Sequence, residues 1–204
     1  LGIEIALRDL FAHPVLRELA NAAQQTELDV LPPLRPVERG GPSPVSLAQQ
    51  RLWFLDQLDH AASAAYHIPA ALRLRGRLQV DALCAALDRI VARHEILRTR
   101  IVNHAGQASL DIDPADIGFT LLERDLCHLH GNELEAAVAH LASDEAATPF
   151  DLATGPLVRG QLLRLAQDEH VLLVTQHHII SDGWSVGVLV QEFSALYTAF
   201  SQGL

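Results

Sequence analysis

Apolar and polar positions follow two different periods along the chain, and the alternation between them predicts a mixture of helices and strands. Apolar residues recur at three- and four-residue steps in four segments, which indicates amphipathic helices near residues 46–58, 80–94, 132–147 and 186–200. Short apolar or alternating runs indicate strands at residues 72–75, 97–102, 108–112, 119–122, 157–165 and 170–176. Such a mixture, with local hairpins, predicts an α/β fold in the broad sense, a mixed α+β sandwich of layers.

Capping residues mark the starts of two of these helices. Ser46 followed three residues later by Gln49 is a capping box, and Asn132 with Glu135 predicts the start of a later helix. Polar residues 49–51 lie within an apolar context. A solvent-facing position is the default interpretation for them, and a position facing a cleft is the alternative.

The first part of the chain is organised differently. Residues 1–25 predict two short helical pieces, because His13-Pro14 interrupts the helical pattern and proline disfavours a helical residue before it. Residues 26–45 are rich in proline and glycine. We expect a semi-extended linker there or, equally, an arm packed along the domain that follows.

A polar stretch lies between the last predicted strand and the last predicted helix. His177, His178, Asp182 and Gly183 fall in this strand-to-helix turn, where a rigid frame on both sides holds polar groups that can face a cleft. His178 can act as a general base because imidazole titrates near neutral pH. Asp182 is expected to hold the turn through a buried ion pair, and Gly183 lets a substrate approach the backbone. The alternative is a pair of hydrogen-bonded structural histidines.

Charge and cysteine content narrow the function further. The net charge of −10 argues against nucleic acid and anionic membranes as partners. Adjacent histidines on an extended chain point to opposite faces, and Cys84 and Cys127 lack metal-ligand spacing, so no metal site is expected. No apolar run or signal-peptide pattern suggests a membrane or secreted protein, and a reducing, cytosolic compartment fits best. Because methionine is absent, we expect a piece of a longer or processed chain.

Three separated stretches, taken in order, resemble the condensation domains of nonribosomal peptide synthetases. They are SLAQQRLWFL at residues 46–55, RHEILRT at residues 93–99 and HHIISDG at residues 177–183. The segments PFDL at 149–152 and GPL at 155–157 are also similar to this family. The third stretch alone is shared with other acyltransferases of the chloramphenicol acetyltransferase type, whereas all three in order are strongly specific. Arg100-Ile101 departs from the aromatic that often follows the second motif, which we interpret as a packing change.

The resemblance implies a fold and a reaction. The fold is one chloramphenicol acetyltransferase-like lobe, half of a pseudo-dimer whose active site lies in a tunnel between two lobes. The enzyme is an aminoacyl or peptidyl transferase, which joins a donor thioester to the amine of an acceptor aminoacyl thioester. Both substrates ride on phosphopantetheine arms of upstream donor and downstream acceptor carrier proteins, beside an adenylation domain.

The resemblance also implies roles for individual residues. His178 is the catalytic histidine, which takes the amine proton or positions the amine. His177 and Asp182 are chiefly structural, and Gly183 lies where the substrate passes. Asp182 needs an arginine partner, either Arg98 or an arginine of the second lobe. The residues expected to line the substrate channel or support it are Arg98, Gln49, Ser181 and Trp184.

The N-terminal residues have a resemblance of their own. Residues 7–20 are similar to the final helices of a peptidyl carrier protein, without the serine that bears phosphopantetheine. The implied organisation is a carrier remnant at residues 1–25, a linker at 26–45 and the N-terminal condensation lobe at 46–204. Without its second lobe, such a fragment is expected to be inactive alone.

Several functional alternatives remain open at this point. An adjacent carrier and the residues after Asp182 favour an elongation domain of the L-to-L type, and a dual epimerisation and condensation type is the alternative. A non-catalytic domain that recruits or positions partner proteins is a further hypothesis from a different class. An acyltransferase that uses a soluble acyl-coenzyme A is a third, which the carrier remnant disfavours.

Overall fold

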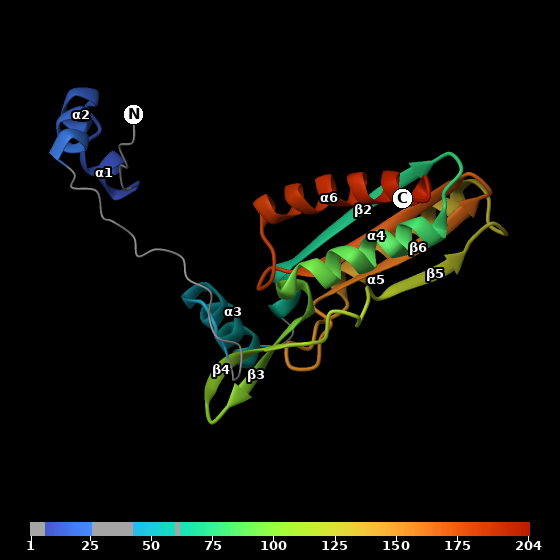
Figure 1. The fold of residues 1–204 in the computed structure, drawn as a ribbon, viewed down its shortest axis with the longest axis horizontal. Coiled ribbons are helices and arrows are strands. Elements are labelled where there is room, and N and C mark those ends of the chain that lie inside the picture. The colour runs from blue at the N-terminus through green and yellow to red at the C-terminus, as the bar shows by residue number, and fades with distance from the viewer. Residues whose placement is uncertain (1–6, 26–42, 60–61) are drawn as a thin grey trace. The chain divides into compact units, whose positions relative to one another are not determined.

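The computed structural model describes residues 7–25, 43–59 and 62–204, which fall into two compact units divided at Gly40–Gly41. The first unit contains helices α1 (Leu7–Ala12) and α2 (Leu16–Gln25), which confirms the two helical pieces interrupted at His13-Pro14 (Figure 1). Most of the expected linker lies outside the described residues. Its end does not: Ser43–Pro44 forms the short strand β1.

A four-stranded sheet carries the functional end of the second unit. Its order is β2 (His67–Arg75), β7 (Glu169–His177), β6 (Val158–Ala166) and β5 (Leu121–Asp125). The β6 and β7 strands form the predicted hairpin, and β2 pairs antiparallel with β7 in a register that sets His67 opposite His177. The strand β7 is therefore paired on both sides, so its end is held rigidly.

Helices cover both faces of this sheet, as the mixed layering predicted (Figure 1). One face packs on α4 (Val80–Arg93) and α6 (Gly183–Ser201) through a core that includes Leu83, Leu162 and Leu172. The other face packs on α5 (Gly131–Ala147) through a core that includes Leu163 and Leu173. Neighbouring residues of β6 and β7 thus serve opposite layers, as the alternation of side chains along a strand requires.

A second, three-stranded sheet holds the first and second motifs beside the large sheet. Its order is β1, β4 (Gln107–Ile112) and β3 (Thr99–His104), and β3 and β4 form the predicted hairpin. Helix α3 (Leu47–Leu58) begins at the predicted capping box, and two 3-10 helices occupy Ala62–Tyr66 and Glu95–Arg98. A shared core joins both regions through residues such as Leu52, Ile101, Phe150 and Ile179.

Two predicted boundaries were wrong. Helix α5 begins at Gly131, so His130 rather than Asn132 is its N-cap, and no cap side-chain hydrogen bond forms there. Gly131 has a φ of +53°, a conformation that glycine adopts without strain and that turns the chain into the helix earlier. Strand β5 begins at Leu121 rather than at Phe119, whose backbone N–H donates instead to Asp88 in α4.

Within the described ranges, the structure contains no helix whose length and hydropathy would allow it to cross a bilayer.

Candidate active site

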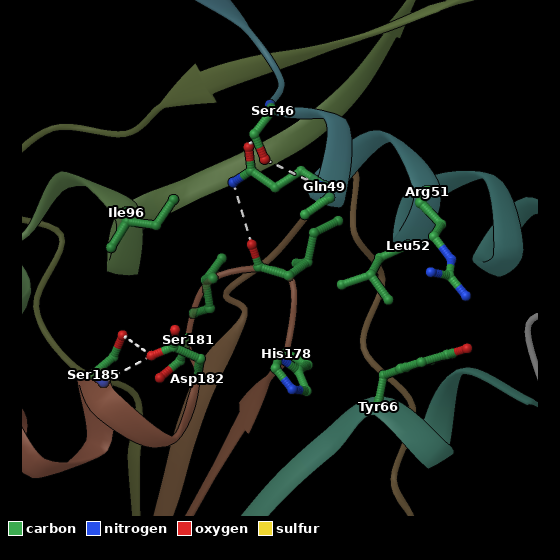
Figure 2. Close-up of a pocket in the computed structure, with 13 residues that line it drawn as sticks. Ser46, Gln49, Arg51, Leu52, Tyr66, Ile96, His178, Ser181, Asp182 and Ser185 are labelled. Carbon is green, nitrogen blue, oxygen red and sulfur yellow. Dashed lines mark hydrogen bonds between the residues drawn. The ribbon is translucent and has the colours of Figure 1, made fainter. Parts of the chain in front are cut away.

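A cleft of about 730 Å³ opens at the end of β7. Its walls come from the first turns of α3, from Tyr66 and Ile96, and from residues 178–182 of the turn that follows the strand (Figure 2). The first and third motifs therefore meet across one cavity, and the second motif contributes Ile96. Segments more than a hundred residues apart are brought together because β2 and β6 clamp β7 and the α3 region packs on the same core.

His178 is the side chain that β7 delivers to this cleft. The strand ends at His177, and the backbone N–H of His178 donates to the carbonyl of Tyr66 at 2.7 Å. The side chain of His178 is exposed and lines the cavity (Figure 2). Its imidazole has no hydrogen-bond partner in the part of the chain that the structure describes, so both ring nitrogens are available to a substrate.

His177 points the opposite way and is completely buried, with 0% exposure. Its Nδ1 accepts a hydrogen bond from the backbone N–H of Ile179 at 3.0 Å. The proton of the neutral ring therefore sits on Nε2, which donates to the Ser63 hydroxyl at 3.2 Å. Burial, reinforced by nearby His67, lowers the pKa of His177 from 6.5 to about 4. His177 is accordingly a neutral structural residue that shapes the turn.

A layer of aromatic and charged groups supports His177 from behind. The rings of His67 and Phe150 lie edge-on to it, with centroids 5.9 and 6.1 Å away. The Arg159 guanidinium lies 3.8 Å above the Phe150 ring and pairs with Glu145 of α5 at 2.7 Å. Sequence reasoning identified the Phe150 motif but missed His67, Arg159 and Glu145, which become neighbours only through strand pairing.

Asp182 does not form the expected buried ion pair. It is exposed and is the N-cap of α6, where its carboxylate accepts from the backbone N–H of Ser185 at 2.8 Å and from the Ser185 hydroxyl at 2.6 Å. These hydrogen bonds, with a smaller contribution from His178, lower the pKa of Asp182. The unpaired N–H groups at a helix start are satisfied by such a carboxylate, which explains why it turns toward its own helix.

Arg98 lies elsewhere. Its guanidinium donates to the backbone carbonyl of Asp113 and pairs with Glu95 at 3.5 Å. It lines a separate cavity of about 90 Å³. Within this chain the structure therefore does not bring Arg98 to Asp182, and the expected pairing of the two was wrong.

The other expected residues occupy distinct positions around the turn. Gly183 is the first residue of α6, and a Cβ atom built there would meet nothing within 4 Å. Ser181 is buried and lines the cleft, and its hydroxyl has no hydrogen-bond partner among the residues described. Trp184 is 85% exposed. Gln49 lines the cleft from α3 and donates to the carbonyl of Ile179 at 3.2 Å (Figure 2).

Groups of three or more histidine, cysteine or acidic side chains that could hold a metal ion are not present in residues 7–25, 43–59 and 62–204. The pocket chemistry is instead that of a base, an ionised carboxylate and hydroxyl and amide groups set in an apolar wall. Such a set suits proton transfer and the binding of a polar acyl group.

Comparison with known proteins assigns this geometry to a family. A model described as the Condensation domain matches residues 41–204. The chain belongs to this family. The condensation domain is 44% identical over 207 residues to malpibaldin synthetase of Mortierella alpina, and 43% identical over 208 residues to a component of the linear gramicidin synthase of Brevibacillus parabrevis. These matches cover 100% and 99% of this chain but only 4% and 3% of the two relatives.

Solved structures show the same chloramphenicol acetyltransferase-like fold. The X-domain from teicoplanin biosynthesis, solved in a complex with OxyB, matches with a TM-score of 0.71 and 35% identity. The match covers 84% of this condensation domain chain and 36% of that one. The resemblance to nonribosomal peptide synthetase condensation domains and the predicted fold class are thus confirmed.

Proposed function

We propose that this chain supplies the catalytic histidine of a condensation domain that forms peptide bonds in nonribosomal peptide synthesis. The observation that carries the proposal is the division of labour within the histidine pair: His177 is buried and neutral, whereas His178 faces the cleft beside the ionised Asp182. A base with no protein partner among the described residues, held by a rigid strand end, is what a proton-transfer step needs.

In the proposed reaction the acceptor amine attacks the donor thioester carbonyl. A C–N bond forms as the C–S bond breaks, and the amine proton passes to His178 and from there to the departing thiolate. His178 also positions the amine, because its backbone is fixed by the bond to Tyr66. Asp182 contributes a negative charge near the imidazole, which favours its protonated form during transfer.

Phosphopantetheine arms on donor and acceptor carrier proteins would present the two thioesters. Each arm supplies a flexible tether that ends in the reacting thioester. The cleft fits such an arm, since Leu52, Ile96 and Ile180 give apolar contact and Gln49 and Ser46 give polar contact. The carriers, an adjacent adenylation domain, a second lobe, the carrier origin of residues 1–25 and a cytoplasmic setting complete the proposal.

The proposed subtype is L-to-L elongation. The test is dipeptidyl-thioester formation by the complete carrier–condensation–carrier unit that contains this chain, with the donor loaded in turn with L- and D-aminoacyl groups. Product from the L-donor alone supports the proposal. Equal use of both donors would favour a dual epimerisation and condensation type.

One observation favours a second candidate, a domain that recruits a partner protein. The teicoplanin X-domain, at 35% identity, was solved in complex with OxyB. If the wild-type unit made no product but bound a partner enzyme stably, the recruitment function would replace peptide-bond formation. The position of His178 in a cleft favours catalysis, because recruitment needs no base.

A further inference from the structure

The turn that carries His178 is held by its backbone rather than by its side chains. On one side, the N–H of His178 donates to Tyr66 at 2.7 Å. Inside the turn, the N–H groups of Ile179 and Ile180 donate to the ring and to the carbonyl of His177, both at 3.0 Å. These bonds fix the inner edge of the turn and leave the carbonyl of Ile179 directed toward the cleft.

Gln49 fastens that outer edge. Its Nε2 donates to the carbonyl of Ile179 at 3.2 Å across the cleft (Figure 2). Its Oε1 accepts the backbone N–H of Ser46 at 2.9 Å, and its own N–H donates to the Ser46 hydroxyl at 3.2 Å. Only one orientation of the carboxamide satisfies both side-chain bonds, because the oxygen must face an N–H and the nitrogen must face a carbonyl. The helix cap of α3 and the histidine turn therefore share one side chain.

We propose that Gln49 is a positioning residue for His178, acting through the carbonyl of Ile179. This inference rests on the proposed function, in which His178 meets the substrate. A capping box accepts glutamate as readily as glutamine, because only the acceptor oxygen is needed for the cap. The helix alone therefore does not require the N–H₂ group of Gln49, whereas the turn does.

That difference separates the two roles by a single atom. In Gln49→Glu, one carboxylate oxygen still accepts the N–H of Ser46, so the cap survives. The other oxygen takes the place of Nε2 and faces the carbonyl of Ile179, which turns a donor–acceptor contact into a repulsion between two acceptors. The variant should keep the fold of α3 and release the outer edge of the turn.

The matched control is Gln50→Glu, which adds the same charge one residue further along α3. Gln50 is exposed and does not line the cleft. A second comparison is Ser46→Ala, which removes the hydroxyl of the cap but leaves the bond from Gln49 to Ile179 in place.

The experiment uses the complete carrier–condensation–carrier unit, and its first readout is amide hydrogen exchange over residues 177–182. We expect faster exchange in Gln49→Glu at an unchanged melting temperature, and wild-type exchange in Gln50→Glu. Ser46→Ala should lower the melting temperature without loosening the turn. Wild-type exchange of the turn in Gln49→Glu would overturn the proposal, as would faster exchange that appears only with a lower melting temperature.

The second readout is the single-turnover rate of peptide-bond formation. Loss of one hydrogen bond that orients the base should slow Gln49→Glu by about tenfold, with Gln50→Glu near wild type. Lowering the pH should narrow the gap between Gln49→Glu and wild type, because the protonated glutamic acid can donate to Ile179 again. A gap that does not change with pH would contradict the positioning role. If wild type forms no product, the proposed function fails, while the exchange measurement still decides the anchoring of the turn.

Discussion

Protonation of His177 should couple the stability of this fold to pH. His177 is completely buried, and both of its ring nitrogens are used by Ile179 and Ser63 in the neutral form. Adding a proton to Nδ1 would destroy the acceptor for the Ile179 N–H and place a charge in the core next to His67. The folded state therefore resists a proton that the unfolded chain accepts readily.

The magnitude follows from the two pKa values. The pKa of His177 is 6.5 in an unperturbed chain and about 4 in the fold. Above the higher value both states are neutral, and stability does not depend on this group. As the pH falls through the window, the unfolded state binds the proton first, so stability is lost. The loss reaches about 2.5 kcal/mol near about pH 4.5 and levels off at about 3.4 kcal/mol below the folded pKa, because each pKa unit is worth about 1.36 kcal/mol.

The assay is the free energy of unfolding in urea from about pH 7.5 to about pH 4.5, for wild type and His177→Asn in the complete domain. Asparagine can still accept the N–H of Ile179 but does not titrate. Other groups also titrate, including His170, whose pKa burial lowers, so the difference between the two proteins isolates His177. The variant should be less stable at neutral pH, and the two curves should converge on acidification. Parallel curves would refute the assignment of a buried, neutral His177.

Further perturbations test the support around the site. Arg159→Ala should destabilise the fold by about 3–5 kcal/mol in urea unfolding, because it leaves the buried carboxylate of Glu145 without its cation. Gly160→Ala should cost about 1–3 kcal/mol, since its Cβ would lie 2.7 Å from a backbone oxygen of β7. Gly183→Ala meets no neighbour within 4 Å, so stability should hold while peptide formation slows if substrate passes there. Asp182→Asn should keep the α6 cap and its melting temperature, whereas Asp182→Ala should lower it.

Each of these has an outcome that contradicts it. An Arg159→Ala protein as stable as Arg75→Ala, which breaks an exposed pair, would show that the Glu145 contact is not a buried one. A melting temperature for Gly160→Ala equal to that of wild type would mean that β6 and β7 can move apart. Unchanged turnover in Gly183→Ala would remove substrate from that space. Equal melting temperatures for both Asp182 variants would show that the cap is dispensable.

Much of the frame around the site could be predicted because it depends on local periodicity. The alternation in β7 already implied that His177 and His178 point to opposite faces, and the structure places one in the core and the other in the cleft. The capping box at Ser46 and Gln49 is equally local and was confirmed.

The contacts that define the site could not be predicted from these patterns. Tyr66, Ser63 and Arg159 come from distant segments, and only the pairing of β2 and β6 with β7 brings them to the histidines. Asp182 was misinterpreted although a local signal existed. An aspartate that precedes an apolar helical run is a typical N-cap, and this geometry competes directly with an ion pair.

The most direct test of the central claim compares wild type with His178→Ala in the complete unit, with both carriers loaded and the dipeptidyl thioester measured by intact mass. His128→Ala, which removes an exposed imidazole after β5, is the control. We predict that product is lost in His178→Ala and retained in His128→Ala, while carrier binding is unchanged in both. Product formation by His178→Ala at the wild-type rate would contradict the role of His178 as the base of this reaction.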